Sequence, residues 1–415
     1  EMIEENYVYV DKTKLIHDLF AKGGKYYFLS RPRRFGKSVL ISTLAEIFSG
    51  NKELFKNLWI YDKIQWTEYP VIHLDLSKIT FKTPEMLEKA LEKRIEKIAA
   101  DYNIKLDPEL YLKEKFGQLI ETLAQKQKVV ILIDEYDKPV ISYMEKGQIE
   151  TAKNIRDVFK SFYSVIKASD EFLRFVFITG VSKFSKVSVF SDLNNLRDIT
   201  MSKQFSELVG YTETELNGYF KPYFAALADE TGFAKEKLPV EIREWYNGYS
   251  WDGERFVYNP YSIINLFTEN SFGNFWFSTG TPTFLVKLIR NRESEIADYE
   301  NLPVKSYTFD TFDIDNIEIV ALLFQTGYLT IKEVTTDNKE KTYHLSYPNK
   351  EVRDSLLNFL FGEYTQKELN VSSRLLDRIK KSIAADDVDR FMQEIKSLFA
   401  SIPYDIFIGN REAYY

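Results

Sequence analysis

Residues 26–38 read YYFLSRPRRFGKS, an apolar run that passes through an arginine-rich loop into Gly36, Lys37 and Ser38. A helical pattern begins directly after them, so the order is strand, loop, helix. A P-loop needs this order because backbone N–H groups at a helix N-terminus cradle phosphate oxygens. The lysine neutralises the β and γ phosphates, and the hydroxyl binds Mg²⁺. The strict pattern G-x-x-x-x-G-K-[ST] fails at one position, where Arg31 replaces glycine.

A second motif strengthens the phosphate-site interpretation. Residues 129–133 read VVILI and run directly into Asp134 and Glu135. This is the form of a Walker B element, in which the aspartate holds Mg²⁺ and the glutamate activates water. Each motif closes a predicted strand, and α/β proteins bind ligands at the carboxyl ends of their strands. The pair predicts an ATP site with Asp134 as metal ligand and Glu135 as base; the alternative is a plain strand end beside a solvated turn.

The loop itself carries an excess of positive charge. Arg31, Arg33, Arg34 and Lys37 lie close together in a segment that contains no acidic side chain. A like-charge pair roughly 4 Å apart costs about 1 kcal/mol even in water, and a bound triphosphate would remove that conflict. We therefore expect the nucleotide to be held by the loop and the first helical turn, namely Arg33, Arg34, Phe35, Gly36, Lys37, Ser38 and Val39.

The remaining catalytic roles have weaker candidates. The fourth predicted strand, residues 174–178, is followed by Thr179, which could orient the attacking water, with Ser182 as the second choice. Turn chemistry explains both hydroxyls equally well. Arg197 lies in the loop after this strand, on the correct side of the sheet for a transition-state arginine, although an ordinary surface salt bridge is the favoured interpretation.

Two further side chains have a functional and a structural interpretation each. Asp75 closes the second predicted strand, residues 71–76, where it could reach a Mg²⁺-bound water or cap the turn at Ser77. Tyr9 precedes a short helix upstream of the P-loop strand. It could stack on the adenine base or pack in the core, and core packing is favoured.

Composition narrows the function classes. The 55 Lys and Arg against 62 Asp and Glu give a net charge of -7, which disfavours extended nucleic acid and anionic membranes as partners of the whole chain. The 44% hydrophobic content predicts an ordered globular protein. With no cysteine and three histidines, metal chemistry must use carboxylates. Apolar runs reach about five residues where a membrane span needs roughly 20, so we expect a soluble protein. The absence of cysteine fits a cytoplasmic location.

The 415 residues predict several domains, led by an α/β core. Apolar strands alternate with amphipathic helices, the pattern of a P-loop NTPase parallel sheet with helices on both faces. A helical subdomain should follow, and then a winged-helix-like α+β module of helix, hairpin and helix. The predicted parts are a P-loop ATPase core at 1–210, a helical lid at 211–303, the winged-helix-like module at 304–365, and C-terminal helices at 366–415.

Several element boundaries follow from local signals. A short fifth strand is expected at 199–202. Thr212 and Glu215 form a capping box that should open a helix through about residue 229. Asn259 with Pro260, and Thr281 with Pro282, each predict a helix start, and an amphipathic helix is expected at 315–326.

Four segments together resemble the bacterial AAA-ATPase-like family over nearly the whole chain. They are YVDKT at 9–13, RPRRFGKS at 31–38, LIDEYD at 132–137 and WYNGY at 245–249. In that family the arginine-rich loop is the usual form, so the resemblance makes Arg31 a family feature. It also implies ATP binding and hydrolysis.

The same resemblance bears on the C-terminus. Family members commonly continue into a PD-(D/E)XK nuclease-like domain, and residues 402–415 look like its entry. Because the chain starts at Glu1 without a methionine and stops at Tyr415, we expect a fragment of a longer protein. Nuclease activity would belong to the missing part.

These observations predict a Mg²⁺-dependent ATPase that acts as a switch for an attached or partner effector. Turnover by the chain alone is expected to be slow, because such ATPases often await an arginine supplied in trans. The alternative is a nucleotide-gated DNA- or protein-binding module with little turnover. The expected cofactors are ATP and Mg²⁺. The sequence leaves open whether the chain self-associates. It also leaves open whether it binds nucleic acid through the missing domain or the winged-helix-like module. No membrane partner is expected.

Overall fold

The structure is a computed structural model that describes residues 2, 5, 7–21, 23–143, 148–183, 193, 195–279, 299–309, 312–313, 316–365 and 369–400. Contacts divide the chain into two compact units. Unit 1 comprises Glu1–Phe272 and Ile296–Asn349, and unit 2 comprises Gly273–Glu295 and Lys350–Tyr415. The predicted helix start at Thr281 and Pro282 and the predicted nuclease entry at 402–415 lie outside the described residues.

Unit 1 is built on a parallel sheet of five strands in the order β2-β3-β4-β1-β5. The three inner strands are buried and read as continuous apolar runs, which is why these three segments could be found in the sequence. The order places β4 between the P-loop strand β1 and the Walker B strand β3. Their bounds are β1 Tyr26–Ser30, β2 Val71–Asp75, β3 Val129–Asp134, β4 Leu173–Gly180 and β5 Arg197–Asp198.

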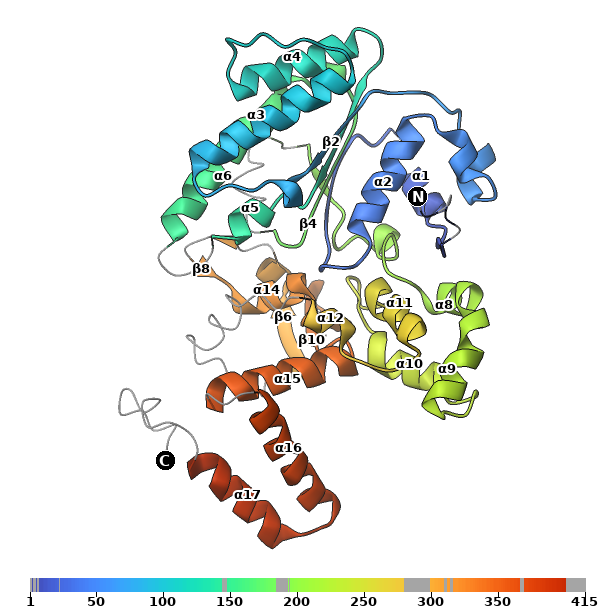
Figure 1. Cartoon of the computed structure of the whole chain (residues 1–415), viewed down its shortest axis with the longest axis vertical. Coiled ribbons are helices and arrows are strands. Elements are labelled where there is room, and N and C mark those ends of the chain that lie inside the picture. Colours follow the sequence, from blue (N-terminus) through green and yellow to red (C-terminus); the bar gives the residue numbers. More distant parts are fainter. Residues whose placement is uncertain are drawn as a thin grey trace. The chain divides into compact units, whose positions relative to one another are not determined.

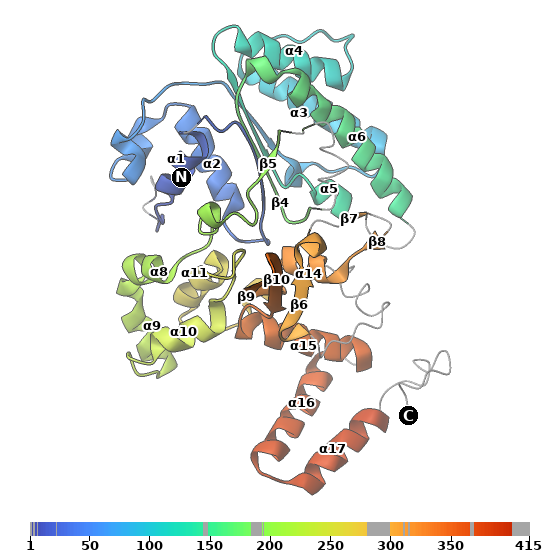
Figure 2. The ribbon, with the colours of Figure 1, turned by 180° about the vertical axis from the view of Figure 1, so that it is seen from behind.

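Helices cover both faces of this sheet, as the parallel-sheet prediction requires. Figures 1 and 2 show α1 and α2 on one face and α3, α4 and α6 on the other. The predicted α/β class with helices on both faces is therefore confirmed. The helices are α1 Thr13–Phe20, α2 Lys37–Phe48, α3 Pro84–Asp101, α4 Leu112–Ala124, α5 Lys138–Ile141 and α6 Ile149–Ala168.

The rest of unit 1 comprises a helical segment and small antiparallel sheets. Strands β6, β10 and β9 form one sheet in that order, and β7 pairs with β8. The predicted hairpin is β9 and β10, joined at Asn338 and Lys339, whose φ values of 46° and 70° suit a tight two-residue turn. The elements are α8 Glu213–Tyr219, α9 Phe224–Thr231, α10 Leu238–Tyr246, α11 Pro260–Glu269, α14 Ile319–Thr326, β6 Leu302–Lys305, β7 Phe312–Asp313, β8 Asn316–Ile317, β9 Thr330–Asp337 and β10 Glu340–Ser346.

Three boundary predictions are wrong. The helix that begins after Thr212 does not run to residue 229: it ends at Tyr219, because Pro222 cannot continue it, and α9 starts afresh. The helix expected from 315 begins only at Ile319, since residues 316–317 pair as strand β8. The fifth strand of the sheet is Arg197–Asp198 instead of 199–202.

Unit 2 is helical in its described part. The backbone N–H of Trp276 in α12 donates to the buried carboxylate of Glu351 in α15 at 2.6 Å. Arg378 of α16 and Glu394 of α17 form an ion pair at 3.1 Å. No helix of the described chain is both long and apolar enough to cross a membrane. The helices are α12 Phe275–Ser278, α15 Lys350–Thr365, α16 Leu369–Ala384 and α17 Val388–Ala400.

Candidate functional site

The loop between β1 and α2 ends in a left-handed glycine directly before the helix. Gly36 has φ of 88°, in the left-handed region that glycine enters without a Cβ penalty, and it directly precedes the first residue of α2. That first residue is Lys37, which is buried, and its Nζ donates to the carbonyl oxygens of Arg31 at 3.0 Å and Pro32 at 2.9 Å. Ser38 follows on the first helical turn and is exposed. The lysine thus lies folded against its own loop.

Asp134 lies across β4 from the P-loop strand, at the same edge of the sheet. Its Oδ1 accepts a 2.5 Å hydrogen bond from the Thr179 hydroxyl of β4 and a 3.0 Å bond from the Glu135 backbone N–H. Both Asp134 and Thr179 are buried. The structure therefore joins the predicted metal ligand directly to the predicted sensor, and this bond holds the carboxylate in one orientation.

The residues present fit a magnesium ion that is shared with phosphate. Oδ2 of Asp134 and the hydroxyl of Ser38 make no hydrogen bond to the part of the chain that the structure describes. Both are oxygen donors of the kind that Mg²⁺ prefers. No group of three or more His, Cys, Asp or Glu among the described residues could hold a metal by itself. Mg²⁺ commonly uses one or two protein oxygens together with phosphates and water, so this sparse set is suitable.

Electrostatic coupling connects the loop with the end of β3. Burial lowers the pKa of Lys37, and the carboxylates of Glu135, Asp134 and Asp137 oppose that effect, while Arg33 adds to it. Burial raises the pKa of Glu135, and the Lys37 ammonium opposes the rise. A carboxylate whose pKa is raised toward neutrality is better suited to accept a proton from water.

Asp137 is a site residue that the sequence analysis missed. Its carboxylate is buried and accepts hydrogen bonds from the Ser182 N–H at 2.6 Å, the Ser182 hydroxyl at 2.7 Å and the Val181 N–H at 3.1 Å. The neighbouring Tyr136 hydroxyl donates to the Ser182 carbonyl at 2.9 Å. These bonds fasten the loop after β3 to the loop after β4. The signal in the sequence was a third acid just past the Walker B pair.

Two residues of the predicted nucleotide set have side chains that are engaged elsewhere. The Arg34 guanidinium lies 4.9 Å from the ring centroid of Tyr261. Phe35 is fully buried, and its ring packs edge-on against Tyr249 and Trp251. In contrast, Arg33 lies close enough to Lys37 to lower its pKa. Phe35 can therefore offer a ligand only its backbone N–H.

The sequence suggested that Arg31 is one of four loop cations that repel one another, and the structure corrects this prediction. The Arg31 side chain is fully buried, and its guanidinium donates to three backbone carbonyl oxygens and lies over the ring of Trp251. Burial lowers the pKa of Arg31 to about 9, and Asp198 and Asp252 oppose the shift. The charge is directed away from the phosphate position and into the protein.

Arg197 is not brought together with the P-loop. It pairs with Tyr27, near the start of β1, and its guanidinium lies 5.9 Å from the ring centroids of Tyr27 and Phe205. The carboxyl end of β1 is Ser30, further along the strand. Arg197 was predicted to lie in a loop; its place within β5 is what removes it from the site edge.

Asp75 and Tyr9 follow the structural alternatives. Asp75 Oδ1 accepts from the Ser77 backbone N–H and hydroxyl, so it caps the turn after β2. The Tyr9 hydroxyl hydrogen-bonds Thr43 of α2 at 3.1 Å, and burial raises the pKa of Tyr9 to about 12. Ser182, the second sensor candidate, directs its hydroxyl to Asp137.

Comparisons with known proteins add the following. A family described as AAA-ATPase-like, "Predicted AAA-ATPase", matches residues 1–190. The chain is 38% identical over 414 residues to an Azotobacter chroococcum mcd 1 protein described as "Uncharacterized protein in vnfD 5'region", covering 99% of this chain and 77% of that protein. The structure of the Aeropyrum pernix ORC1 protein in complex with DNA aligns with 86% of this chain and 95% of that chain, at 13% identity and a TM-score of 0.30. A score that low supports no inference.

Proposed function

The chain belongs to the AAA-ATPase-like family, and from that premise we propose that it is a Mg²⁺-dependent ATPase that works as a switch for an effector. One observation carries the proposal. Lys37, which begins α2 after the loop that follows β1, lies at the same sheet edge as Asp134 of β3 and Thr179 of β4, and these three strands are adjacent. Such convergence at the carboxyl ends of parallel strands is where α/β proteins bind their ligands.

The loop and first helical turn would hold the nucleotide. Backbone N–H groups from Arg33 to Val39 can receive phosphate oxygens at the N-terminus of α2. The Lys37 ammonium would exchange its two loop carbonyls for the β and γ phosphates. Arg33 adds positive charge beside it. Arg34 contributes its backbone, since its guanidinium lies over Tyr261.

Two carboxylates and two hydroxyls would bind the metal ion and activate water. Ser38 and Asp134 would hold Mg²⁺, which supplies charge neutralisation on the phosphates when bound. Thr179 would keep Asp134 oriented through its 2.5 Å hydrogen bond. It would then position the metal ligand, in addition to the sensor role predicted from the sequence. Glu135 would take the proton of the attacking water, consistent with its raised pKa.

The position of Arg197 affects the expected rate. Because its guanidinium packs on Tyr27 and Phe205, it does not serve the site in this arrangement. An arginine supplied by a partner can raise the rate of a P-loop enzyme by about 10³ to 10⁵. We therefore expect the chain alone to bind Mg-ATP and to turn over slowly.

The proposal is tested by calorimetry and turnover on matched variants. Lys37→Ala should lose Mg-ATP affinity, because it removes the ammonium group that would contact the phosphates. Glu135→Gln should keep affinity and lose turnover by about 10² to 10⁴, the usual contribution of a general base. Glu121→Gln, an exposed acid on α4, is the control and should behave as wild type. Absence of Mg-ATP binding by wild type would refute the proposed function.

A second candidate function is a nucleotide-gated binding module, and one contact favours it. The loop after β4 reaches α14, because the Lys183 backbone N–H donates to Gln325 Oε1 at 2.7 Å. A change at the site could thus pass from the core, 1–210, to the winged-helix-like module, 304–365. DNA binding measured against salt, with and without an ATP analogue, tests this role. A nucleotide-independent, salt-insensitive response would count against it.

A further inference from the structure

Arg31 occupies the position of the first P-loop glycine, and its side chain anchors the loop from behind. Nη1 donates to the carbonyl oxygens of Ser30 at 2.9 Å and Thr200 at 2.8 Å, and Nη2 donates to that of Phe205 at 3.4 Å. The guanidinium carbon lies 3.8 Å from the ring centroid of Trp251, a cation–π contact inside the protein. The planar guanidinium holds its donors in a fixed geometry, and here its two terminal nitrogens serve all three carbonyls.

Phe35 gives the loop a second anchor on the same segment. Its ring centroid lies 4.7 Å from that of Tyr249 and 5.5 Å from that of Trp251, both edge-on. Arg31 and Phe35 flank the exposed part of the loop, so residues 249–251 fix it at both ends. We refer to Tyr249 and Trp251 as the aromatic socket.

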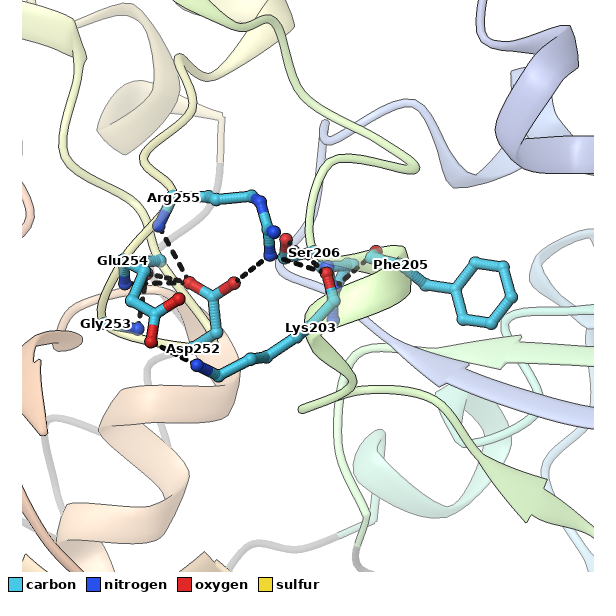
Figure 3. Close-up of polar contacts among 9 residues, drawn as sticks. Lys203, Phe205, Ser206, Asp252, Gly253, Glu254 and Arg255 are labelled. Carbon is cyan, nitrogen blue, oxygen red and sulfur yellow. Dashed lines mark hydrogen bonds and ion pairs between the residues drawn. The ribbon is translucent and has the colours of Figure 1, made fainter. Parts of the chain in front are cut away.

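The aromatic socket is itself held by the surrounding chain. Ser250 lies between Tyr249 and Trp251 in the sequence. Its backbone N–H donates to the Thr330 hydroxyl at 2.7 Å, and that hydroxyl donates to the Ser250 carbonyl oxygen. Figure 3 shows the loop that follows, where Arg255 donates to the Lys203 carbonyl at 2.8 Å. Lys203 in turn pairs with Glu254. The socket and the turn that supplies the Phe205 carbonyl are thus fastened to each other.

We propose that Arg31 and Trp251 are positioning residues of the nucleotide site, which hold the P-loop in its phosphate-binding shape where other P-loops use glycine. The physical link is Lys37, whose Nζ rests on the Arg31 and Pro32 carbonyl oxygens. A shift of the Arg31 backbone displaces both carbonyls and the loop amides beyond them. This inference rests on the proposed function, since it concerns the same site.

The decisive variant is Arg31→Gly, which completes the strict G-x-x-x-x-G-K-S pattern. If only the pattern mattered, this change would preserve or improve affinity. The anchor instead predicts a rise of tenfold or more in the Kd for Mg-ATP, with kcat at saturating ATP within about threefold of wild type, because uniform binding is lost. It also predicts faster hydrogen exchange of the backbone amides from Arg33 to Lys37 without nucleotide.

Further variants separate the anchor from general destabilisation. Arg31→Lys keeps the positive charge and loses the planar guanidinium, so it should weaken Mg-ATP binding. Trp251→Phe keeps an aromatic ring, so it should bind Mg-ATP better than Trp251→Ala does. Arg31→Gly and Trp251→Ala should be non-additive in Kd, because they break one contact. The control is Arg94→Ala, which removes an arginine–carbonyl bond from edge strand β2 and should leave Kd unchanged.

Each outcome decides the matter. An Arg31→Gly protein that binds Mg-ATP as tightly as wild type, with unchanged exchange in the loop, overturns the anchor. If that variant does not fold, Arg31→Lys and Trp251→Phe give the same comparison. If wild type binds no nucleotide, the proposed function fails, and unchanged exchange in the Arg31 variants would still refute the anchor separately.

Discussion

At the scale of single residues, buried charge gathers around the loop after β1. Arg31, Lys37, Asp134 and Asp137 are each less than a tenth exposed. Burying an ion costs free energy unless it is paired and hydrogen-bonded. Here carbonyl oxygens receive the two cations, and N–H or O–H groups donate to the two carboxylates. Buried groups whose pKa values are shifted, as those of Arg31, Lys37 and Asp137 are, tend to cluster at functional sites.

Gly180 at the end of β4 leaves no room for a side chain. A Cβ there would lie 2.5 Å from two ring carbons of Tyr136 and 2.7 Å from Asp137 Oδ1. Gly180→Ala should therefore lower the melting temperature, at a cost of about 1–3 kcal/mol for overpacking. The control is Gly218→Ala in α8, where nothing lies within 4 Å of the added Cβ. Equal melting temperatures for the two variants would contradict the prediction.

Lys332 on β9 provides a pH test. Burial lowers its pKa to about 8, and its Nζ donates to the Pro348 carbonyl. The unfolded chain still binds this proton between about pH 8 and 10.5, so the stability of wild type rises with pH across that window. Wild type should gain in melting temperature relative to Lys332→Met between pH 7 and pH 10. Exposed Lys341→Met is the control, and a constant difference for Lys332→Met would exclude the effect.

At the scale of elements, the site depends on loops that follow three adjacent strands. β4 supplies Thr179 to Asp134 at the end of β3, and its register pairs Gly180 with Ser30 at the end of β1. Asp137 then ties the loops after β3 and β4 together. Because the strands themselves are buried and rigid, they fix where each loop begins. The geometry of the candidate site is thus a property of neighbouring strand ends.

Loss of the Asp137 hydrogen bonds should reduce turnover. Asp137→Asn keeps the shape and removes part of the acceptor set for Val181 and Ser182. We expect kcat to fall by up to about 100-fold, the cost of displacing site groups by about 1 Å, with a smaller change in KM. Asp75→Asn, which weakens a turn cap and the ion pair with Lys78, is the matched control. An unchanged kcat in Asp137→Asn would remove this residue from the site.

Local signals predicted the elements well and failed where strand pairing intervened. The strand at Tyr26–Ser30 and the helix start at Pro260 occur as expected, because an apolar run and an Asn-Pro cap act within a few residues. The helix expected at 315–326 starts late because residues 316–317 pair with 312–313. Arg197 was misplaced for the same reason: pairing with β1 makes it part of a strand.

At the scale of the whole molecule, the chain divides into two compact units that differ in secondary structure. Unit 1 contains the parallel sheet, the candidate site and the antiparallel hairpin, and the described part of unit 2 is helical. The family description covers residues 1–190, which include the P-loop and Asp134 but not Trp251. If Trp251 positions the loop, the functional nucleotide unit extends beyond the matched segment.

The two units should respond differently to nucleotide. Calorimetry of the whole chain should resolve more than one transition, since units of this kind tend to unfold separately. Mg-ATP at about a hundred times its Kd should stabilise the unit 1 transition by about 2.7 kcal/mol and leave the other in place. Lys37→Ala serves as the control, because it should abolish the shift. Equal shifts of both transitions would show that nucleotide binding is not confined to unit 1.

The sequence by itself determined the parallel α/β core, the strand-loop-helix order at 26–38, the buried strand that ends at Asp134 and the family, because apolar runs and short motifs depend on a few neighbouring residues. Only the tertiary structure decided what Arg31 does. Two of its three carbonyl partners lie 169 and 174 residues away in the chain, and no local pattern records them. The same holds for Asp137, whose partner lies 45 residues on. A buried charge is defined by what surrounds it, and folding brings those groups together.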